Sequence, residues 1–239
     1  MNKNILVTGG SKRGGAAISR AIHRRGFDVL IHCRESSEGA AQILTNELNA
    51  IRPNSAKFWS QDLTLKNLAL PQETKNTVGI VANASEYIKS DLNNFSERLD
   101  LDIQTHLTSH LRLIQLLKQS LIENNGAVVA VLDIRINRPK KGNLTYQISK
   151  GALDTAVRAL AVELAPAVRV NSVSPGPLEW PTNPPYTQER KDQILNATPL
   201  GRVGAFEELA AAVCFLLFDA TFTTGATIPV DGGRSIYLI

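Results

Sequence analysis

Short apolar runs alternate with longer amphipathic stretches along the whole chain of 239 residues. The short runs, most of them continuously apolar as in a parallel sheet covered on both faces, predict strands at residues 5–8, 29–32, 56–59, 78–82, 127–132, 168–173 and 227–230. Helical spacing of apolar residues lies between them, at residues 16–25, 39–50, 99–121, 146–165 and 206–218. This alternation predicts an α/β fold, a Rossmann-type doubly wound parallel sheet with helices on both faces.

Composition limits the class of protein further. With 43% hydrophobic and 20% charged residues, the chain is expected to form one globular domain, residues 1–239. The net charge is +4 and the basic residues are scattered apart from residues 135–141, which argues against nucleic-acid binding and favours a local site for an anion. Cys33 and Cys214 stand far apart and predict buried thiols, and no metal-ligand spacing occurs.

The N-terminal segment lacks the apolar region and cleavage site of a signal peptide. The longest apolar run, residues 209–218, is too short to cross a bilayer. We therefore expect a cytoplasmic protein that does not contact a membrane. The proline-rich residues 175–185 predict an irregular segment, and we expect a substrate loop around residues 175–198.

A glycine-rich turn joins the first predicted strand to the first predicted helix. In open parallel sheets, ligands bind beyond the carboxyl ends of the strands, where this turn lies. Glycine lets the backbone approach a pyrophosphate closely, and a helix N-terminus offers it free N–H groups and a partial positive charge. The candidate nucleotide contacts in this turn are Gly9, Ser11, Lys12, Arg13 and Gly15.

The residues after the second and third strands bear on the choice of cofactor. An acid after the second strand would bind the ribose 2′-hydroxyl of NAD, but here Arg34 stands between His32 and Ser36. Arg34, with the basic residues of the glycine turn, can pair with a 2′-phosphate, which favours NADPH/NADP. Glu35 keeps NAD open, and Arg34 can also be a solvated charge. After the third strand, Asp62-Leu63 fits a contact to the adenine amino group, or a helix N-cap.

Tyr146 and Lys150 are four residues apart at the start of a predicted helix, so both lie on one helical face. An ammonium group close to a phenol favours the phenolate and lowers the tyrosine pKa from about 10, which makes a proton donor. The same spacing is also common on surface helices without any chemistry.

Several motifs occur in one order over the whole chain: Thr8-Gly9 with Gly15, Asn83-Ala84, Tyr146 with Lys150, Pro175-Gly176 and Val230-Asp231-Gly232-Gly233. With them the chain resembles the short-chain dehydrogenase/reductase family. The resemblance implies a Rossmann-type domain, a nicotinamide cofactor and a homotetramer. It also implies that Tyr146 is the proton donor, that Lys150 binds the nicotinamide ribose and tunes the tyrosine, that Asn83 lines the cofactor ribose, and that Pro175-Gly176 borders the nicotinamide.

Three departures from the family pattern narrow the resemblance. Arg13 replaces the usual glycine of the first turn, Ser85 follows Asn-Ala, and Asp133 replaces the usual catalytic serine thirteen residues before the tyrosine. These departures resemble pteridine reductases and the bacterial dihydromonapterin and dihydrofolate reductases of the family. The resemblance implies that Arg13 reaches the cofactor phosphate and the pterin, that Ser85 contacts the pterin, and that Tyr87 stacks on it. Tyr87 fits core packing equally well.

Asp133 is the most informative of these departures. A serine donates a hydrogen bond to a substrate carbonyl, whereas an ionised aspartate can only accept and would repel a developing alkoxide. A pterin has amino and N–H donors and a reducible C=N bond, which suits a carboxylate. An aspartate that only caps the next turn is the alternative. Trp180 is expected to close over the pterin, and Lys140 or Lys141 to meet a glutamyl tail or to stay solvated.

Two further features are expected near the site. His106 falls where many family members have an asparagine that supports a proton-relay water. The segment between Asp62 and Asn83 is short, so the third helix of the fold must be abbreviated.

The sequence thus predicts an NADPH-dependent reductase of a pterin or folate. The catalytic residues are Asp133, Tyr146 and Lys150, and the substrate residues include Arg13, Ser85, Tyr87 and Trp180. A carbonyl reductase of a 3-oxoacyl thioester or other ketone is the alternative. A non-catalytic NADP-binding sensor is the second alternative.

Overall fold

Seven parallel strands form one sheet in the computed structural model, which describes residues 3–182 and 185–237. The order across the sheet is β3-β2-β1-β4-β5-β6-β7, so the chain winds outward in both directions from β1 and β4. The strands are β1 (Asn4–Val7), β2 (Asp28–Cys33), β3 (Ala56–Ser60), β4 (Thr77–Ala82), β5 (Ala127–Val131), β6 (Arg169–Pro175) and β7 (Thr227–Val230). The predicted Rossmann-type fold and all seven predicted strands are confirmed.

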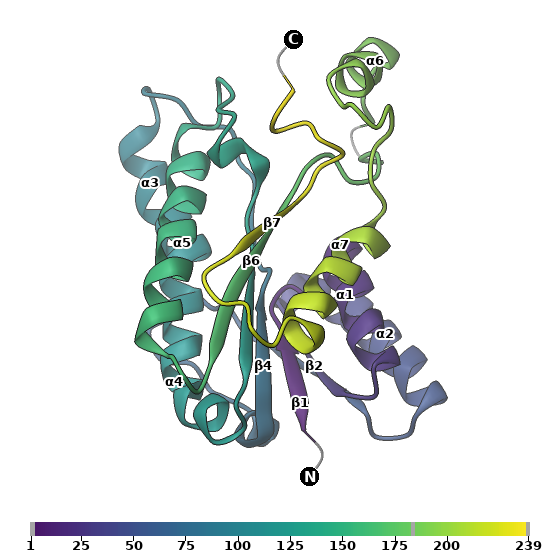
Figure 1. Ribbon diagram of the computed structural model, residues 1–239, viewed down its shortest axis with the longest axis vertical. Coiled ribbons are helices and arrows are strands. Elements are labelled where there is room, and N and C mark those ends of the chain that lie inside the picture. Colours follow the sequence, from purple (N-terminus) through teal and green to yellow (C-terminus); the bar gives the residue numbers. More distant parts are fainter. Residues whose placement is uncertain (1–2, 183–184, 238–239) are drawn as a thin grey trace.

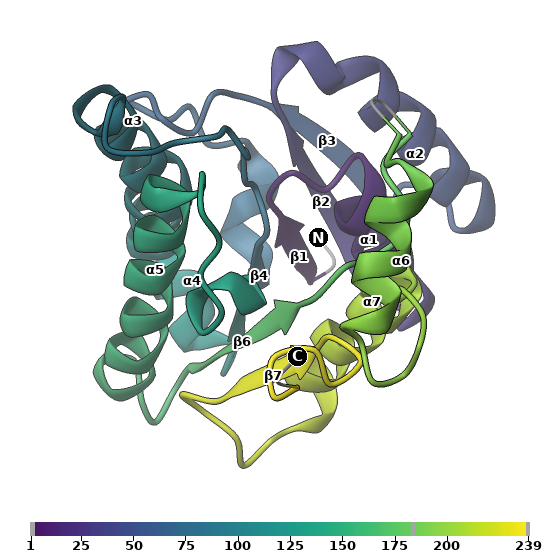
Figure 2. The same cartoon turned by 90° about the horizontal axis from the view of Figure 1, so that it is seen from above.

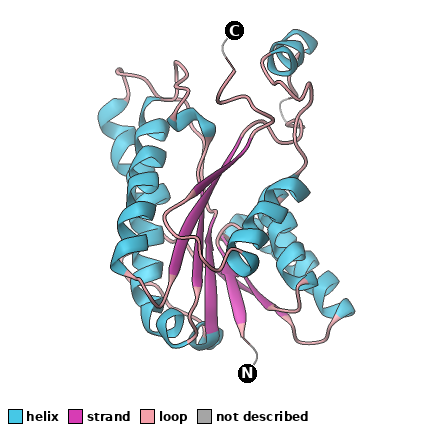
Figure 3. Cartoon of the chain, viewed as in Figure 1, coloured by secondary structure: helices cyan, strands magenta, loops and turns pink. Residues whose placement is uncertain are grey.

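Helices cover both faces of the sheet, as Figures 1 and 3 show. One face carries α1 (Arg13–Arg24), α2 (Glu38–Ile51) and α7 (Phe206–Cys214), and the other carries α3 (Phe95–Ile103), α4 (Ser109–Glu123) and α5 (Leu144–Glu163). Successive strand residues point to opposite faces and enter different cores. Ile5 and Val7 pack in the core with α1 and α7, and Leu6 packs in the core with α4 and α5.

The predicted helix 99–121 is longer than expected and irregular. It begins at Phe95, runs through α3, passes through a π-helical turn at Gln104–Thr108 and continues as α4. π-helical turns inside α-helices are frequent at functional sites. His106 lies in the middle of this turn and is fully buried.

Two connections bear on the other predictions. The crossover from β3 to β4 contains only a 3₁₀ helix, Gln72–Asn76, which confirms that the third helix is abbreviated. The segment 175–198, by contrast, contains a helix that the sequence did not predict, α6 (Gln188–Asn196). Its sequence QERKDQILN has no apolar stripe, but Thr187 accepts from the Arg190 amide and caps it. That N-cap threonine was the only available signal.

The carboxyl ends of the strands point to the upper edge of the sheet in Figure 1, where α6 and the C-terminal segment lie above them. Figure 2 looks down on this edge. We call it the site edge. Elsewhere, Cys33 and Cys214 are free and buried as predicted. In the described residues, no helix is long and apolar enough to cross a membrane, and no group of acidic, histidine or cysteine side chains is placed to hold a metal ion.

Candidate active site

The glycine turn after β1 has one position that favours glycine and one that excludes a side chain. Gly9 has a φ of 60°, in the region that favours glycine. A Cβ on Gly15 would lie 2.0 Å from the Gly9 carbonyl oxygen. The N-cap of α1, Lys12, makes no side-chain hydrogen bond, and the first turn of α1 contains no acidic residue. The N-terminus of α1 is therefore suited to an anion such as a pyrophosphate.

His32 holds this turn in place. The Gly9 amide donates to Nδ1 of His32 over 3.2 Å, and Nε2 lies 2.9 Å from the Gln61 carbonyl oxygen. Burial lowers the pKa of His32 to about 4, so the ring is neutral with the proton on Nε2. Both ring nitrogens therefore bind protein atoms, and the contact of His32 with the cofactor stays a prediction.

Asn83 also ties the turn together. Its side-chain nitrogen donates to the Thr8 carbonyl over 2.9 Å and to the Gly9 carbonyl over 3.2 Å. The amides of Asn83 and Ala84 donate to the Thr8 hydroxyl oxygen. The ends of β1 and β4 are thereby joined by polar contacts on one side of the predicted cofactor path.

Three of the residues predicted to bind the adenosine half of the cofactor line one open cavity of about 570 Å³: Arg34, Ser36 and Asp62. Arg34 lies 3.8 Å from the Glu86 carboxylate, a loose and exposed pair that leaves the guanidinium free to bind a phosphate. The Asp62 carboxylate accepts from the amide and hydroxyl of Thr64, so it caps a turn and not a helix. Leu63 does not line the cavity, because its side chain is buried in the core.

Tyr146 and Asp133 meet at the site edge. Asp133 comes two residues after β5, and Tyr146 lies in the first turn of α5. The phenol donates to Oδ2 of Asp133 over 3.1 Å, and Oδ1 accepts from the Arg135 amide over 2.8 Å. Asp133 therefore both caps the following turn, as the alternative interpretation held, and contacts the predicted proton donor.

The aspartate changes the acid–base behaviour expected of Tyr146. Burial raises the pKa of Tyr146 well above 10, and the Asp133 charge and hydrogen bond raise it further, while Ser85 and Arg135 oppose them. The net shift of the Tyr146 pKa is thus upward, opposite to the lowering that the sequence predicted. Burial and the adjacent carboxylate outweigh the ammonium, which lies 5.9 Å from the centre of the phenol ring. Tyr146 thus holds its proton at neutral pH, as a proton donor in a reduction requires.

Lys150 is 1% exposed, and its ammonium donates to the Val131 carbonyl over 2.8 Å. Burial lowers the pKa of Lys150 to about 8, and the Asp133 charge opposes this effect. The side chain is thus fixed between α5 and the end of β5, with its charge below the phenol ring.

A buried chain of polar groups connects Tyr146 to the glycine turn. His106 binds the Ser149 hydroxyl through Nδ1 at 2.8 Å and the Glu86 backbone through Nε2, and its ring lies 5.3 Å from the Tyr146 ring. His110 binds the His106 carbonyl at 2.9 Å and the Thr8 hydroxyl at 3.2 Å. Burial lowers the pKa of His106 to about 3 and that of His110 to about 4. Both rings are neutral.

His106 therefore lies beside Tyr146, as predicted, but both its nitrogens bind protein atoms. His110 and Ser149 were not predicted. The only signal for His110 was its spacing, four residues after His106 on one helix.

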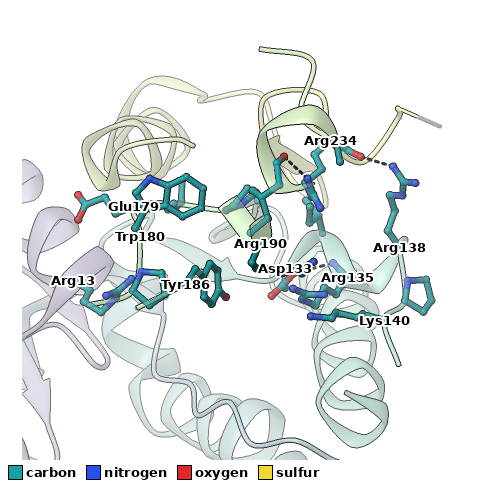
Figure 4. Close-up of a pocket in the computed structure, with 18 residues that line it drawn as sticks. Arg13, Asp133, Arg135, Arg138, Lys140, Glu179, Trp180, Tyr186, Arg190 and Arg234 are labelled. Atoms are coloured by element: carbon teal, nitrogen blue, oxygen red, sulfur yellow. Dashed lines mark hydrogen bonds between the residues drawn. The ribbon is translucent and has the colours of Figure 1, made fainter. Parts of the chain in front are cut away.

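The predicted substrate residues divide into two groups. Arg13, Asp133 and Trp180 line one cavity of about 500 Å³ together with Gly176, which we call the site cavity (Figure 4). Ser85, Tyr87 and Tyr146 are not among the residues that line it.

Tyr87 is half-exposed, its hydroxyl donates to Asn143, and its ring stands edge-on to Tyr146 with centres 5.3 Å apart. It therefore packs directly against the predicted proton donor. The half-exposed ring of Tyr87 can thus both pack against Tyr146 and contact a ligand.

Arg13 adopts a φ of 46°, a conformation that glycine adopts more readily than arginine. Its guanidinium lies 5.0 Å from the centre of the Phe206 ring. An arginine held in an unfavourable backbone conformation beside a cavity indicates that its side chain has a function there.

A glycine turn at a helix N-terminus, with a tyrosine–lysine pair at the same edge of a Rossmann-type sheet, defines a nicotinamide-dependent oxidoreductase. Comparison with known proteins agrees. A family model described as enoyl-(acyl carrier protein) reductase matches residues 11–235. The chain belongs to the short-chain dehydrogenase/reductase family.

Individual relatives cover nearly the whole chain. The uncharacterized oxidoreductase YmfI of Bacillus subtilis is 32% identical over 98% of this chain and 99% of its own. The 3-oxoacyl-[acyl-carrier-protein] reductase FabG of Aggregatibacter actinomycetemcomitans is 31% identical over the same shares. Among solved structures, FolM alternative dihydrofolate reductase 1 of Brucella suis in complex with NADP superposes with a TM-score of 0.90, at 28% identity over 100% of this chain and 97% of that one.

Proposed function

We propose that this oxidoreductase uses NADPH to reduce the C=N bond of a dihydropterin, such as dihydromonapterin, dihydrobiopterin or dihydrofolate, to the tetrahydro form. The observation that carries the proposal is the hydrogen bond from Tyr146 to Asp133, in the position where a carbonyl-reducing family member has a serine. The likeness to FolM alternative dihydrofolate reductase 1 supports it.

Each of the three residues at the reactive end has a separate role in the proposed reaction. When bound, NADPH supplies a hydride to the carbon of the C=N bond. The phenol of Tyr146 gives its proton to the ring nitrogen, which gains an electron pair and becomes a stronger base than tyrosinate. The Lys150 ammonium stabilises the resulting phenolate. Asp133 accepts from the amino or N–H donors of the pterin and orients the ring toward Tyr146.

The cofactor fits the residues present. The pyrophosphate would be held by the uncapped N-terminus of α1 and by the turn residues Gly9, Ser11, Lys12 and Gly15. Gly15 has no side chain, and the structure has no space for one there. Arg34 and Ser36 would hold a 2′-phosphate, and Asp62 would face the adenine. Asn83, Ala84, Pro175 and Gly176 would line the nicotinamide half, since they lie at the ends of β4 and β6.

The cofactor preference has its own test. Changing Arg34 to alanine should weaken NADPH binding on the order of tenfold to a hundredfold while changing NADH binding little, because each charge-assisted contact contributes roughly 1.5 to 3 kcal/mol. Fluorescence titration of both cofactors measures this. Equal loss for the two would show that Arg34 does not bind the phosphate.

On the substrate side, the pterin would lie between the nicotinamide and Tyr87, with Arg13 and Ser85 at its polar edge. Within a single domain of residues 1–239, the loop 175–198 would close over it through Trp180, which packs against Tyr186 with ring centres 6.3 Å apart. Residues 183 and 184 of this loop lie outside the described residues. We also propose a homotetramer, supported by exposed apolar side chains on the outer helices: Leu101, Leu116, Ile148 and Val162.

The proposed activity is tested by following NADPH oxidation with dihydrobiopterin, dihydromonapterin, dihydrofolate and an acetoacetyl thioester. We expect turnover of at least one pterin and little turnover of the thioester, because Asp133 would repel a developing alkoxide. Turnover of the thioester alone would reject the proposal.

The similarity to a 3-oxoacyl-[acyl-carrier-protein] reductase favours one alternative, reduction of a 3-oxoacyl thioester or other ketone. That reaction would have to proceed with an aspartate beside the proton donor. A non-catalytic NADP-binding sensor is the second alternative, and the intact Tyr146 and Lys150 argue against it. Cofactor binding without reduction of any compound in the panel would favour the sensor.

A further inference from the structure

The wall of the site cavity next to Asp133 carries a group of basic side chains. We call Arg135, Arg138, Lys140, Arg190 and Arg234 the cation cluster; all five line the cavity of about 500 Å³. They come from three separate segments: the residues after β5, helix α6 and the residues after β7. Figure 4 shows Arg135 and Lys140 beside Asp133, with Arg13 and Glu179 on the opposite side of the cavity.

The cluster has no acidic partner. Eight ion pairs occur among the described residues, and none of them includes a member of the cluster. The acidic residues that line the cavity are Asp133 and Glu179. Each carboxylate oxygen of Asp133 accepts one hydrogen bond, from the Tyr146 phenol or the Arg135 amide, and Asp133 forms no ion pair with the cluster.

The members of the cluster repel one another. Burial lowers the pKa of Lys140, and the charges of Arg190, Arg135, Lys89 and Arg234 lower it further. Burial also lowers the pKa of Arg234, as do Arg190, Arg135 and Arg138, against the opposing effect of Asp231. An arrangement of like charges costs stability unless an anion lies among them.

Neutral groups hold the cluster in position and leave donors free. Arg234 donates to the Ile194 carbonyl over 2.8 Å and to the Thr198 hydroxyl over 3.2 Å, and Arg138 donates to the Arg234 carbonyl over 2.7 Å. Each guanidinium has five N–H donors, so these contacts leave several unused. The side chains of Arg135 and Lys140 have no hydrogen-bond partner in the described part of the chain, so both are free to bind a ligand.

The cavity connects this cluster to the reactive end of the site. Asp133 and Gly176 line the same cavity, and its volume lies within the range of pockets that enclose drug-sized ligands, roughly 300 to 1,000 Å³. A ring placed against Asp133 would therefore leave room in the same cavity for a substituent beside Arg190 and Lys140. We infer that the cation cluster is a subsite for an anionic tail on the substrate, one that carries two or more negative charges as carboxylates or phosphate. This inference rests on the proposed function and adds to it the class of pterin that is used.

The test compares reduction of four dihydropterins by the full chain with NADPH. They are dihydrobiopterin with a neutral tail, dihydrofolate with one glutamate, dihydrofolate with three glutamates, and a dihydropterin phosphate ester. We expect KM to fall about tenfold or more from the neutral tail to the charged ones, and this advantage to shrink as salt is raised. The glutamates and the phosphate ester distinguish the two sources of negative charge.

Arg190→Gln, Lys140→Gln and the double variant locate the effect. Each single change should raise KM for the charged substrates several-fold, and should raise it much less for dihydrobiopterin. Arg158→Gln is the matched control, because Arg158 carries the same charge on α5 and pairs with Asp154 away from the cavity. Arg190→Lys should restore part of the affinity, since it restores the charge. Circular dichroism of each variant verifies folding.

The outcomes separate the two proposals. Equal KM for neutral and charged pterins, or equal losses in Arg190→Gln and Arg158→Gln, would overturn the subsite while leaving pterin reduction intact. Reduction of no pterin, with turnover of a coenzyme A thioester that depends on Arg190, would overturn the proposed function and the pterin tail together, and would assign the cluster to the phosphates of the thioester.

Discussion

The buried polar groups around Tyr146, the reactive end of the site, and the cation cluster of the site cavity, its far end, are built in opposite ways. At the reactive end, Tyr146, Lys150 and His106 are almost fully buried, and each polar group has a partner within hydrogen-bonding distance. At the far end, the five members of the cation cluster are partly exposed and have no acidic partner among the described residues. Groups that perform chemistry must be preorganised, whereas groups that bind a variable charged tail function best when their donors remain free.

The difference also shows in electrostatics. Burial lowers the pKa values of His106 and Lys150 to about 3 and about 8, and with Asp133 it raises that of Tyr146. At the far end, mutual repulsion between cations is a contributing cause of the lowered pKa values. Changes at the reactive end should therefore alter rates and pH dependence, and changes at the far end should alter KM and salt dependence.

The largest effect should come from the proton donor. Tyr146→Phe should lower kcat for pterin reduction roughly 100-fold to 10,000-fold, because the ring nitrogen loses its proton source. NADPH affinity, measured by fluorescence titration, should stay the same. Tyr186→Phe changes a half-exposed tyrosine on the loop beside Trp180 and is the control. Its kcat should stay within about twofold, as for most surface changes. A Tyr146→Phe enzyme with normal kcat would remove Tyr146 from the mechanism.

The buried histidines should make the protein sensitive to acid. Their folded pKa values are about 4 for His32, about 3 for His106 and about 4 for His110, all below the usual 6.5. The unfolded chain binds protons first as pH falls, so stability is complete above about pH 6.5 and decreases as pH falls toward 4.

We expect each histidine to cost roughly 1 to 2 kcal/mol of unfolding free energy between pH 7 and pH 5. Urea unfolding at pH 7, 6 and 5 measures this loss. The cation cluster keeps its charge over this range and should not contribute. His110→Gln should reduce the slope with pH; an unchanged slope in that variant would place the acid sensitivity elsewhere.

Two variants of Asp133 separate the effect of its negative charge from the effect of its hydrogen bonds. Asp133→Ser should lower kcat/KM for pterins on the order of tenfold to a hundredfold, because a charge-assisted contact is lost. It should also lower the pKa of Tyr146, since the carboxylate raises it, and move the alkaline limb of the rate profile to lower pH. Asp133→Asn keeps the acceptor without the charge and should shift the profile alone. Full pterin activity in Asp133→Ser would leave the carboxylate without a catalytic role.

The smallest effect concerns the backbone of Arg13. Arg13→Gly should raise the free energy of unfolding by up to about 1 kcal/mol, because glycine adopts a positive φ without strain. The same change should weaken NADPH or pterin binding. Arg13→Ala removes the guanidinium but keeps the backbone strain. Thermal unfolding of both variants therefore separates the loss of the side chain from the relief of the strain. Lower stability of Arg13→Gly than of wild type would mean that contacts of the side chain, such as that with Phe206, outweigh the strain.

The sequence predicted the sheet well because its strands are buried on both faces and appear as continuous apolar runs. It failed for α6, whose residues are mostly polar and lie on the cavity rim. The sequence also could not show what the His32 ring binds, because its partners Gly9 and Gln61 are distant from it in sequence.

The sequence by itself determined the family, the sheet, and the tyrosine, lysine and aspartate that mark the site, because local periodicity and short motifs carry that information. Only the tertiary structure decided that Asp133 raises the tyrosine pKa, that His106 and His110 connect Tyr146 to the glycine turn, and that five cations from three segments share one cavity. The desolvation of Tyr146 and the gathering of the five cations are properties of the packed chain. Each requires residues that lie far apart in sequence to lie close together in space.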